Sequence, residues 1–300
     1  MAMDKRPESS GDLGHEWDGI RELDNDPPRW WMIAGYITII FLVVYFVLYP
    51  AVPYAPFAHG NSKGVLGYTQ IDEYRKGLEA IKSARAPWEN KIASLSTDEV
   101  LHDSDLLNYI SESSRVTFGE YCAPCHDKGG QGFSEFPNLT DDDWLYGGTV
   151  DEIIDSIRDG REGVMNAYKT ILSQQEIDDL VKYVTLLPDG EIYEEGRKVF
   201  LGQTEGEADC ASCHGEDGKG IKAFGATNLT DSIWRFSGSP DEVKRTIEYG
   251  INAGIDETRR PLMPPFTGKI SEDRIKTLAI YVWALGGGQT RAEPEGTPVD

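Results

Sequence analysis

Cysteine, methionine and histidine are all scarce in this chain, whose 300 residues hold four, five and five of them. Four cysteines cannot build a dense disulfide framework, and a chain of this length can bury a core without one. Basic residues are also few, 29 against 51 acidic ones, so the formal net charge is −22. This charge excludes nucleic acid as a partner, because phosphate binding relies on Lys and Arg.

All four cysteines lie in two copies of one motif, Cys-x-x-Cys-His. The copies are Cys122-Ala123-Pro124-Cys125-His126 and Cys210-Ala211-Ser212-Cys213-His214. This is the pattern of covalent haem c attachment. Cysteines three residues apart on one turn can bond both porphyrin vinyl groups, and the following imidazole can bind iron. We therefore predict two covalently bound haem c groups.

Other uses of paired cysteines fit this pattern poorly. A structural zinc site would draw four ligands from two nearby pairs, but these pairs are 88 residues apart and each is followed by His. A thioredoxin-like redox pair would need neither the His nor a second copy. The two motifs therefore favour haem over zinc or thiol chemistry.

Two methionines are candidates for the second axial iron ligand. Met165 and Met263 each follow one motif in a loop-like context, whereas the other methionines lie within the first 32 residues. A thioether ligand raises the haem potential. A Met that only fills a core gap is the alternative, but a scarce residue recurs at the same place in both repeats. The repeat assigns Met165 to His126 and Met263 to His214, and leaves an exchange between the modules open.

The region after residue 107 is an internal duplication. Asn138-Leu139-Thr140-Asp141 and Trp144 recur 90 residues later as Asn228-Leu229-Thr230-Asp231 and Trp234. Their Asn-x-Thr strings also fit glycosylation acceptors, but exact repetition beside a Trp favours a duplicated module. Apolar residues three and four apart follow each Met, which predicts an amphipathic helix. We expect all-α cytochrome c domains at 108–189 and 190–288 and a C-terminal tail at 289–300.

Residues 30–49 form an uncharged, mainly apolar stretch that is long enough to cross a bilayer once. Twenty-nine polar, acidic residues precede it, unlike the short basic start of a cleavable signal peptide. Four basic residues precede it, whereas the first twenty residues after it hold only Lys63, and this difference predicts that residues 1–29 are a cytoplasmic tail. This orientation agrees with the haem prediction, because haem c is attached to proteins outside the cytoplasm. We expect a single-pass protein of the bacterial inner membrane with periplasmic haem domains.

Residues 50–107 are predicted to be a periplasmic spacer with a helix-like stretch at 71–82. His59 and His102 fall here and are predicted to be solvated, since each module already has a Met. The acidic charge would steer a basic electron donor in a salt-sensitive way. Solubility alone is the alternative explanation of that charge.

Further strings give a specific resemblance. They are His15-Glu16-Trp17-Asp18-Gly19-Ile20-Arg21-Glu22, Asp24 to Trp31, Asn138 to Gly148 and Gly163-Val164-Met165. With them the chain resembles the dihaem subunit (subunit III) of cbb3-type cytochrome c oxidases.

The resemblance implies electron transfer in low-oxygen respiration, with no active site in this chain. Electrons would pass from a c-type cytochrome or the bc1 complex to a monohaem subunit and then to a catalytic subunit with haem b and copper. Haem attachment would fall on Cys122, Cys125, Cys210 and Cys213, and iron ligation on His126, Met165, His214 and Met263. The chain departs from the family at Asn166, where Pro is frequent, and at Asp127, where Gly is common.

Two other classes of protein share the haem motifs. One is a free-standing membrane-anchored dihaem carrier or the cytochrome subunit of a periplasmic dehydrogenase. The other is a dihaem peroxidase, which needs an open or switchable iron, and two well-placed methionines argue against that.

Overall fold

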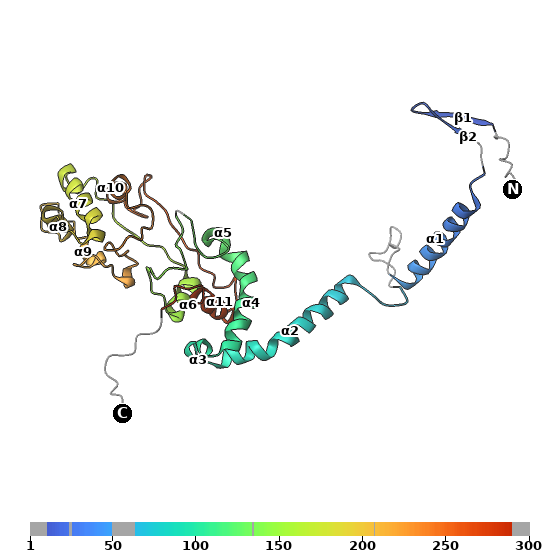
Figure 1. The fold of residues 1–300 in the computed structure, drawn as a ribbon, viewed down its shortest axis with the longest axis horizontal. Helices are drawn as coiled ribbons and strands as arrows, with labels where there is room; N and C mark the ends of the chain where they lie inside the picture. Colours follow the sequence, from blue (N-terminus) through green and yellow to red (C-terminus); the bar gives the residue numbers. More distant parts are fainter. Residues whose placement is uncertain (1–10, 24–25, 50–63, 134, 207, 290–300) are drawn as a thin grey trace, which may run out of the picture. The chain divides into compact units, whose positions relative to one another are not determined.

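The structure is a computed structural model that describes residues 11–23, 26–49, 64–133, 135–206 and 208–289 (Figure 1). It divides into two compact units, Met1–Arg85 and Ala86–Asp300. Apart from one short hairpin, the regular elements of the described residues are helices. The all-α fold class is therefore confirmed.

The first unit begins with a hairpin that the sequence did not predict. Strands β1 (Asp12–Trp17) and β2 (Ile20–Leu23) pair antiparallel. Between them, Asp18 and Gly19 both have positive φ, 50° and 83°. An Asp-Gly pair suits this turn because both residues tolerate positive φ and the turn matches the twist of the strands. Trp17 and Ile20 at its ends are exposed.

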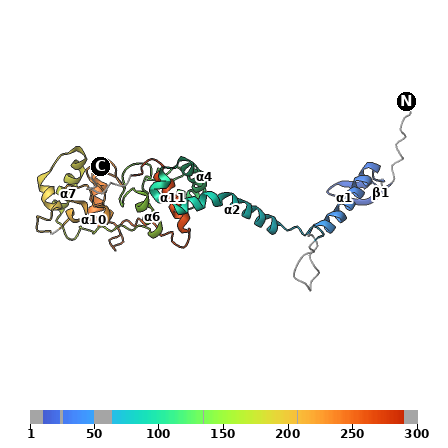
Figure 2. The same ribbon diagram turned by 90° about the horizontal axis from the view of Figure 1, so that it is seen from below.

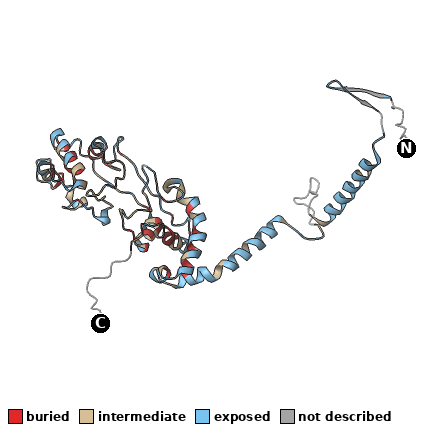
Figure 3. Ribbon diagram, viewed as in Figure 1, coloured by how far each residue is buried: buried red, intermediate tan, exposed pale blue. Residues whose placement is uncertain are grey.

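Helix α1 (Arg29–Leu48) follows Pro28 and coincides, to within one residue at each end, with the predicted membrane span. None of its residues is buried in the described structure, as Figure 3 shows. Among the described residues it is the one helix that is long and apolar enough to cross a membrane. The single predicted anchor is thus present as a helix.

Helix α2 (Gln70–Ser94) extends the predicted helical stretch, and the boundary between the two units falls within it. The short helix α3 (Thr97–Leu101) begins with a capping box between Ser96 and Glu99. Ile92 and Val100 are buried in the same core as α4 (Ser104–Tyr121). The end of the predicted spacer 50–107 is therefore part of a packed core. Residues 50–63, with His59, lie outside the described residues.

The second unit has two hydrophobic cores. We call the core built by α4, α6 and α11 the first core, and the core built by α7, α8 and α10 the second core. Their buried residues are marked in Figure 3. The remaining bounds are α5 Ala123–His126, α6 Val150–Asp159, α7 Gln174–Leu186, η1 Leu187–Asp189, α8 Glu194–Phe200, α9 Ala211–His214, η2 Lys222–Phe224, α10 Pro240–Tyr249 and α11 Glu272–Trp283.

The helix that follows each methionine packs in the core of the other repeat. Helix α11, at the end of the chain, lies beside α4 and α6, whereas α7 lies beside α8 and α10 (Figures 1 and 2). The predicted boundaries 108–189 and 190–288 therefore do not coincide with the two cores. Chain connectivity gives the reason: only residues 187–193 join α7 to α8, and short connections favour neighbouring helices.

Candidate haem-binding site

Each motif sits on one short turn of helix, α5 for the first motif and α9 for the second. Cys122 ends α4 and opens α5, so the first motif is anchored to the first core. Cys210 opens α9 in the same way and packs against the second core. A single turn puts the paired sulfurs and the next imidazole on one side of the backbone, as haem attachment requires.

Both motif histidines are held by a backbone carbonyl. The distance from His126 Nδ1 to Pro137 O is 3.0 Å, and that from His214 Nδ1 to Thr227 O is 3.0 Å. Since a carbonyl only accepts, Nδ1 carries the proton and Nε2 keeps its lone pair for a metal. Burial lowers the pKa of both histidines, which keeps the imidazoles neutral. Both rings are therefore prepared as iron ligands.

The residue after each motif turns the chain with a positive φ. Gly215 has a φ of 76°, and Asp127, at the equivalent place, has a φ of 63° and a ψ of 162°. This conformation is nearly restricted to Gly and costs another residue about 1–3 kcal/mol. Asp127, which stands where the family commonly has Gly, therefore has a strained backbone conformation.

One continuous cavity of about 840 Å³ connects the two motifs. Its walls include Phe118, Trp144 and Leu180 as well as both motifs and both methionines. Burial raises the pKa of Cys122 and Cys210 to about 12, so both thiols are neutral before any bond forms. The described cysteines form no disulfide. An apolar cavity with thiols and imidazoles at its edge fits haem c well.

The methionine loops cross between the repeats. Met263 pairs with Arg161 through two backbone hydrogen bonds of 2.9 Å and packs against the core that holds Cys122. Met165 pairs with Ile251 through bonds of 2.8 and 2.9 Å and packs against the core that holds Cys210. The structure therefore brings Met263 to the side of the first motif and Met165 to that of the second.

His102, which the sequence analysis predicts to be solvated, is exposed, and its Nδ1 lies 2.7 Å from the Asp98 carbonyl oxygen. The sequence analysis missed an aromatic and arginine pair in each repeat: the Arg161 guanidinium lies 4.9 Å from the Tyr146 ring centre, and that of Arg259 lies 4.3 Å from that of Phe236. The repeat could have found them, since each arginine precedes a methionine by four residues.

The comparisons with known proteins agree with this site. The family described as cytochrome C oxidase, cbb3-type, subunit III matches residues 112–184 and 199–282. The N-terminal domain of cytochrome oxidase-cbb3, FixP, matches residues 10–56.

Full-length relatives match almost the whole chain. It is 37% identical to the cbb3-type cytochrome c oxidase subunit FixP of Azorhizobium caulinodans, covering 92% of this chain and 93% of that protein. It is 36% identical to subunit CcoP of an Azospirillum species (96% and 100%) and 32% identical to subunit CcoP of Cereibacter sphaeroides (95% and 98%). The chain belongs to the family of subunit III of cbb3-type cytochrome c oxidases, a family of membrane-anchored haem c electron-transfer subunits.

Proposed function

We propose that this chain carries two covalently bound haem c groups and passes electrons through them towards the oxygen-reducing part of a cbb3-type oxidase. The continuous cavity that joins both Cys-x-x-Cys-His motifs carries this proposal. The partners are a monohaem cytochrome c subunit and a haem b and copper catalytic subunit, and the donor is a c-type cytochrome or the bc1 complex. The N-terminus lies in the cytoplasm and the haem domains in the periplasm.

The methionine ligands are exchanged between the repeats. His126 and Met263 bind the iron of the first haem, which is attached to Cys122 and Cys125. His214 and Met165 bind the iron of the second haem, attached to Cys210 and Cys213. The backbone pairing of each methionine with the segment after α6 or α10 supports this assignment, which replaces the pairing inferred from the repeat.

The protein's own groups prepare both sites for electron transfer. The Pro137 and Thr227 carbonyls keep each histidine proton on Nδ1. Haem c, when bound, supplies one-electron chemistry at its iron. The backbone pairing of both methionines and the hydrogen bonds of both histidines would hold these ligands in one arrangement when haem is bound.

A tagged haem tests the exchange. Cys122→Ala leaves one vinyl group of the first haem intact, which shifts its visible absorption band and marks it optically. In this background, Met263→His should lower the reduction potential of the tagged haem, because Met ligation raises it, and leave the other haem unchanged. Met165→His should lower the reduction potential of the untagged haem and leave that of the tagged haem unchanged. A tagged haem that responds to Met165→His instead would show that the ligands are not exchanged.

Purification from native membranes in mild detergent tests the assignment to an oxidase. Haem b, copper and cytochrome c-dependent oxygen uptake should accompany the chain. Haem c alone in a gently solubilised sample would favour a free carrier. Rapid cyanide binding to the haem c groups would favour a peroxidase, since two filled axial positions exclude it.

A further inference from the structure

Two arginines of the haem cavity have a buried N–H group with no partner. Arg161 Nε and Arg235 Nη1 are buried without a hydrogen-bond acceptor among the described residues. Both arginines line the cavity that joins the motifs. An unpaired buried donor on a cation is costly, so both groups call for a hydrogen-bond acceptor inside this cavity, and an anionic acceptor would also balance the guanidinium charge.

The second repeat shows how such an arginine is otherwise satisfied. Arg259 precedes Met263 by four residues, as Arg161 precedes Met165. Its guanidinium forms an ion pair with Glu242 and a 2.6 Å hydrogen bond to Thr246 Oγ1, and its side chain is 11% exposed. The positive charge at this place in the second repeat is therefore already neutralised by the protein.

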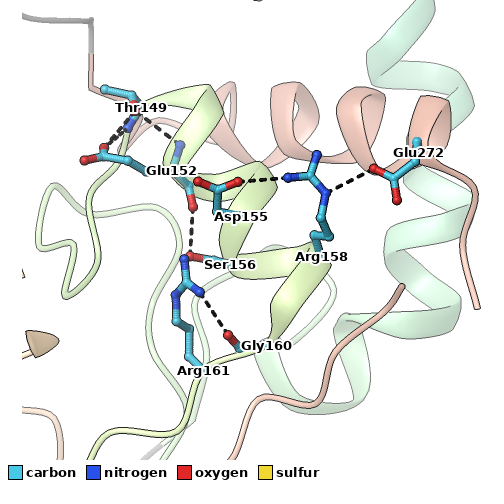
Figure 4. Close-up of polar contacts among 8 residues, drawn as sticks. All are labelled: Thr149, Glu152, Asp155, Ser156, Arg158, Gly160, Arg161 and Glu272. Carbon is cyan, nitrogen blue, oxygen red and sulfur yellow. Dashed lines mark hydrogen bonds and ion pairs between the residues drawn. The ribbon is translucent and has the colours of Figure 1, made fainter. Parts of the chain in front are cut away.

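In the first repeat the equivalent carboxylate is occupied elsewhere. Glu152, which corresponds to Glu242, accepts hydrogen bonds of 3.0 and 2.7 Å from the backbone N–H and the hydroxyl of Thr149 (Figure 4). This capping box starts α6. Helix α10 begins at Ser239 and Pro240, where the described structure has no side-chain cap, so Glu242 stays available. Arg161 is left with a 3.0 Å bond to its neighbour, the Gly160 carbonyl, and the Tyr146 ring.

Arg235 adds a second positive charge, with a buried Nη1, to the lining of the same cavity. It belongs to the second repeat, where it replaces Leu145 of the first. Burial lowers the pKa of Arg235, and Tyr146 and Glu135 of the first repeat oppose that shift. Arg235 lines the same cavity as His126 and Tyr146, and the Arg161 guanidinium lies over the Tyr146 ring.

We propose that Arg161 and Arg235 bind the propionate carboxylates of the haem attached to Cys122 and Cys125, and that their charges raise its reduction potential. The proposal rests on the proposed function, which places a haem there. Propionates are the anionic groups of haem, and a guanidinium matches a carboxylate in shape and charge. Positive charge beside the haem stabilises the reduced iron, which carries one positive charge fewer.

Redox titration of the complete oxidase tests this proposal in the Cys122→Ala background, where the first haem is marked. Arg235→Gln and Arg161→Gln should each lower the ratio of reduced to oxidised tagged haem about tenfold at fixed potential, which is a shift of about 59 mV for one electron. The reduction potential of the untagged haem should stay unchanged. Arg235→Lys keeps the charge and should recover most of the shift.

Arg197→Gln is the matched control, because it removes the same charge from an exposed ion pair with Glu194 on α8. A tagged haem that keeps its potential in both glutamine variants would overturn the proposal. An equal shift in the Arg197 control would also overturn it, since the effect would then reflect total charge. If a glutamine variant loses haem, Arg161→Lys and Arg235→Lys give the comparison. The tag identifies the first haem even if the methionines prove not to be exchanged.

Discussion

Two glycines set how closely each methionine loop approaches the other repeat. Gly160 ends α6 with a φ of 71°, and Gly250 ends α10 with a φ of 65°. A Cβ atom on Gly160 would lie 2.4 Å from the Met263 carbonyl oxygen, and one on Gly250 would lie 2.3 Å from that of Met165. A side chain at either place would therefore separate a methionine loop from its partner segment.

Substitution of Gly160 should weaken the binding of Met263 to the iron of the first haem. We expect Gly160→Ala to weaken methionine ligation of the first haem and to lower stability by about 2 kcal/mol or more, since positive φ and a backbone clash act together. Gly190→Ala is the matched control, because Gly190 has a φ of 74° but no described atom within 4 Å of the added Cβ. The methionine-to-iron charge-transfer absorption and the unfolding midpoint report the two effects. Equal behaviour of the two variants would contradict the role of the clash.

At the scale of helices, α7 and α11 have the same pattern and exchange places. Ile177, Leu180 and Val184 of α7 correspond to Ile275, Leu278 and Val282 of α11, and all six are buried. Either helix could therefore fill either core by its apolar face alone. The seven residues that connect α7 to α8 decide in favour of the second core, which leaves the first core to α11.

Truncation of matched leucines should act on opposite haems. Leu278 is 0% exposed in the first core and Leu180 is 2% exposed in the second. We expect Leu278→Ala and Leu180→Ala each to cost about 2–5 kcal/mol. During denaturant unfolding, the first haem should lose its low-spin spectrum earlier in Leu278→Ala, and the second haem earlier in Leu180→Ala. The reverse order would show that the helices pack within their own repeats.

At the scale of the whole molecule, charge and anchoring set how the chain meets its partners. The net charge of −22 suits an electron donor with a basic surface. The helix α1 and the second unit are separate parts of the described chain. The anchor therefore confines the protein to a membrane, and we expect the acidic charge to attract a basic soluble donor over a distance.

Salt should weaken the encounter with a basic donor. We expect the rate of haem reduction by a basic c-type cytochrome to fall about tenfold or more between low and high ionic strength, because salt shortens the range of the field. Stopped-flow mixing measures this rate, and an uncharged small-molecule reductant serves as the control. A rate that is independent of salt would show that the acidic surface serves only solubility.

The sequence by itself determined the local chemistry of this protein. Haem attachment is a pattern of five residues, a membrane span is a run of about twenty, and a duplication is visible as an offset of 90, so none of these needs contacts between distant segments. The N-terminal hairpin of β1 and β2 was missed, although Asp18-Gly19 is a hairpin turn pair, because its strands are short.

Only the tertiary structure decided which methionine lies beside which motif and which arginines lack a hydrogen-bond partner for a buried N–H group. The two repeats carry the same apolar pattern and the same methionine, so their sequences cannot distinguish packing within a repeat from packing across repeats. The short connection from α7 to α8 decides that the helices pack across the repeats. Arg161 lacks a carboxylate partner because the cap at Thr149 occupies Glu152. This matters because Arg161 lines the same cavity as the first motif, which only the folded chain shows.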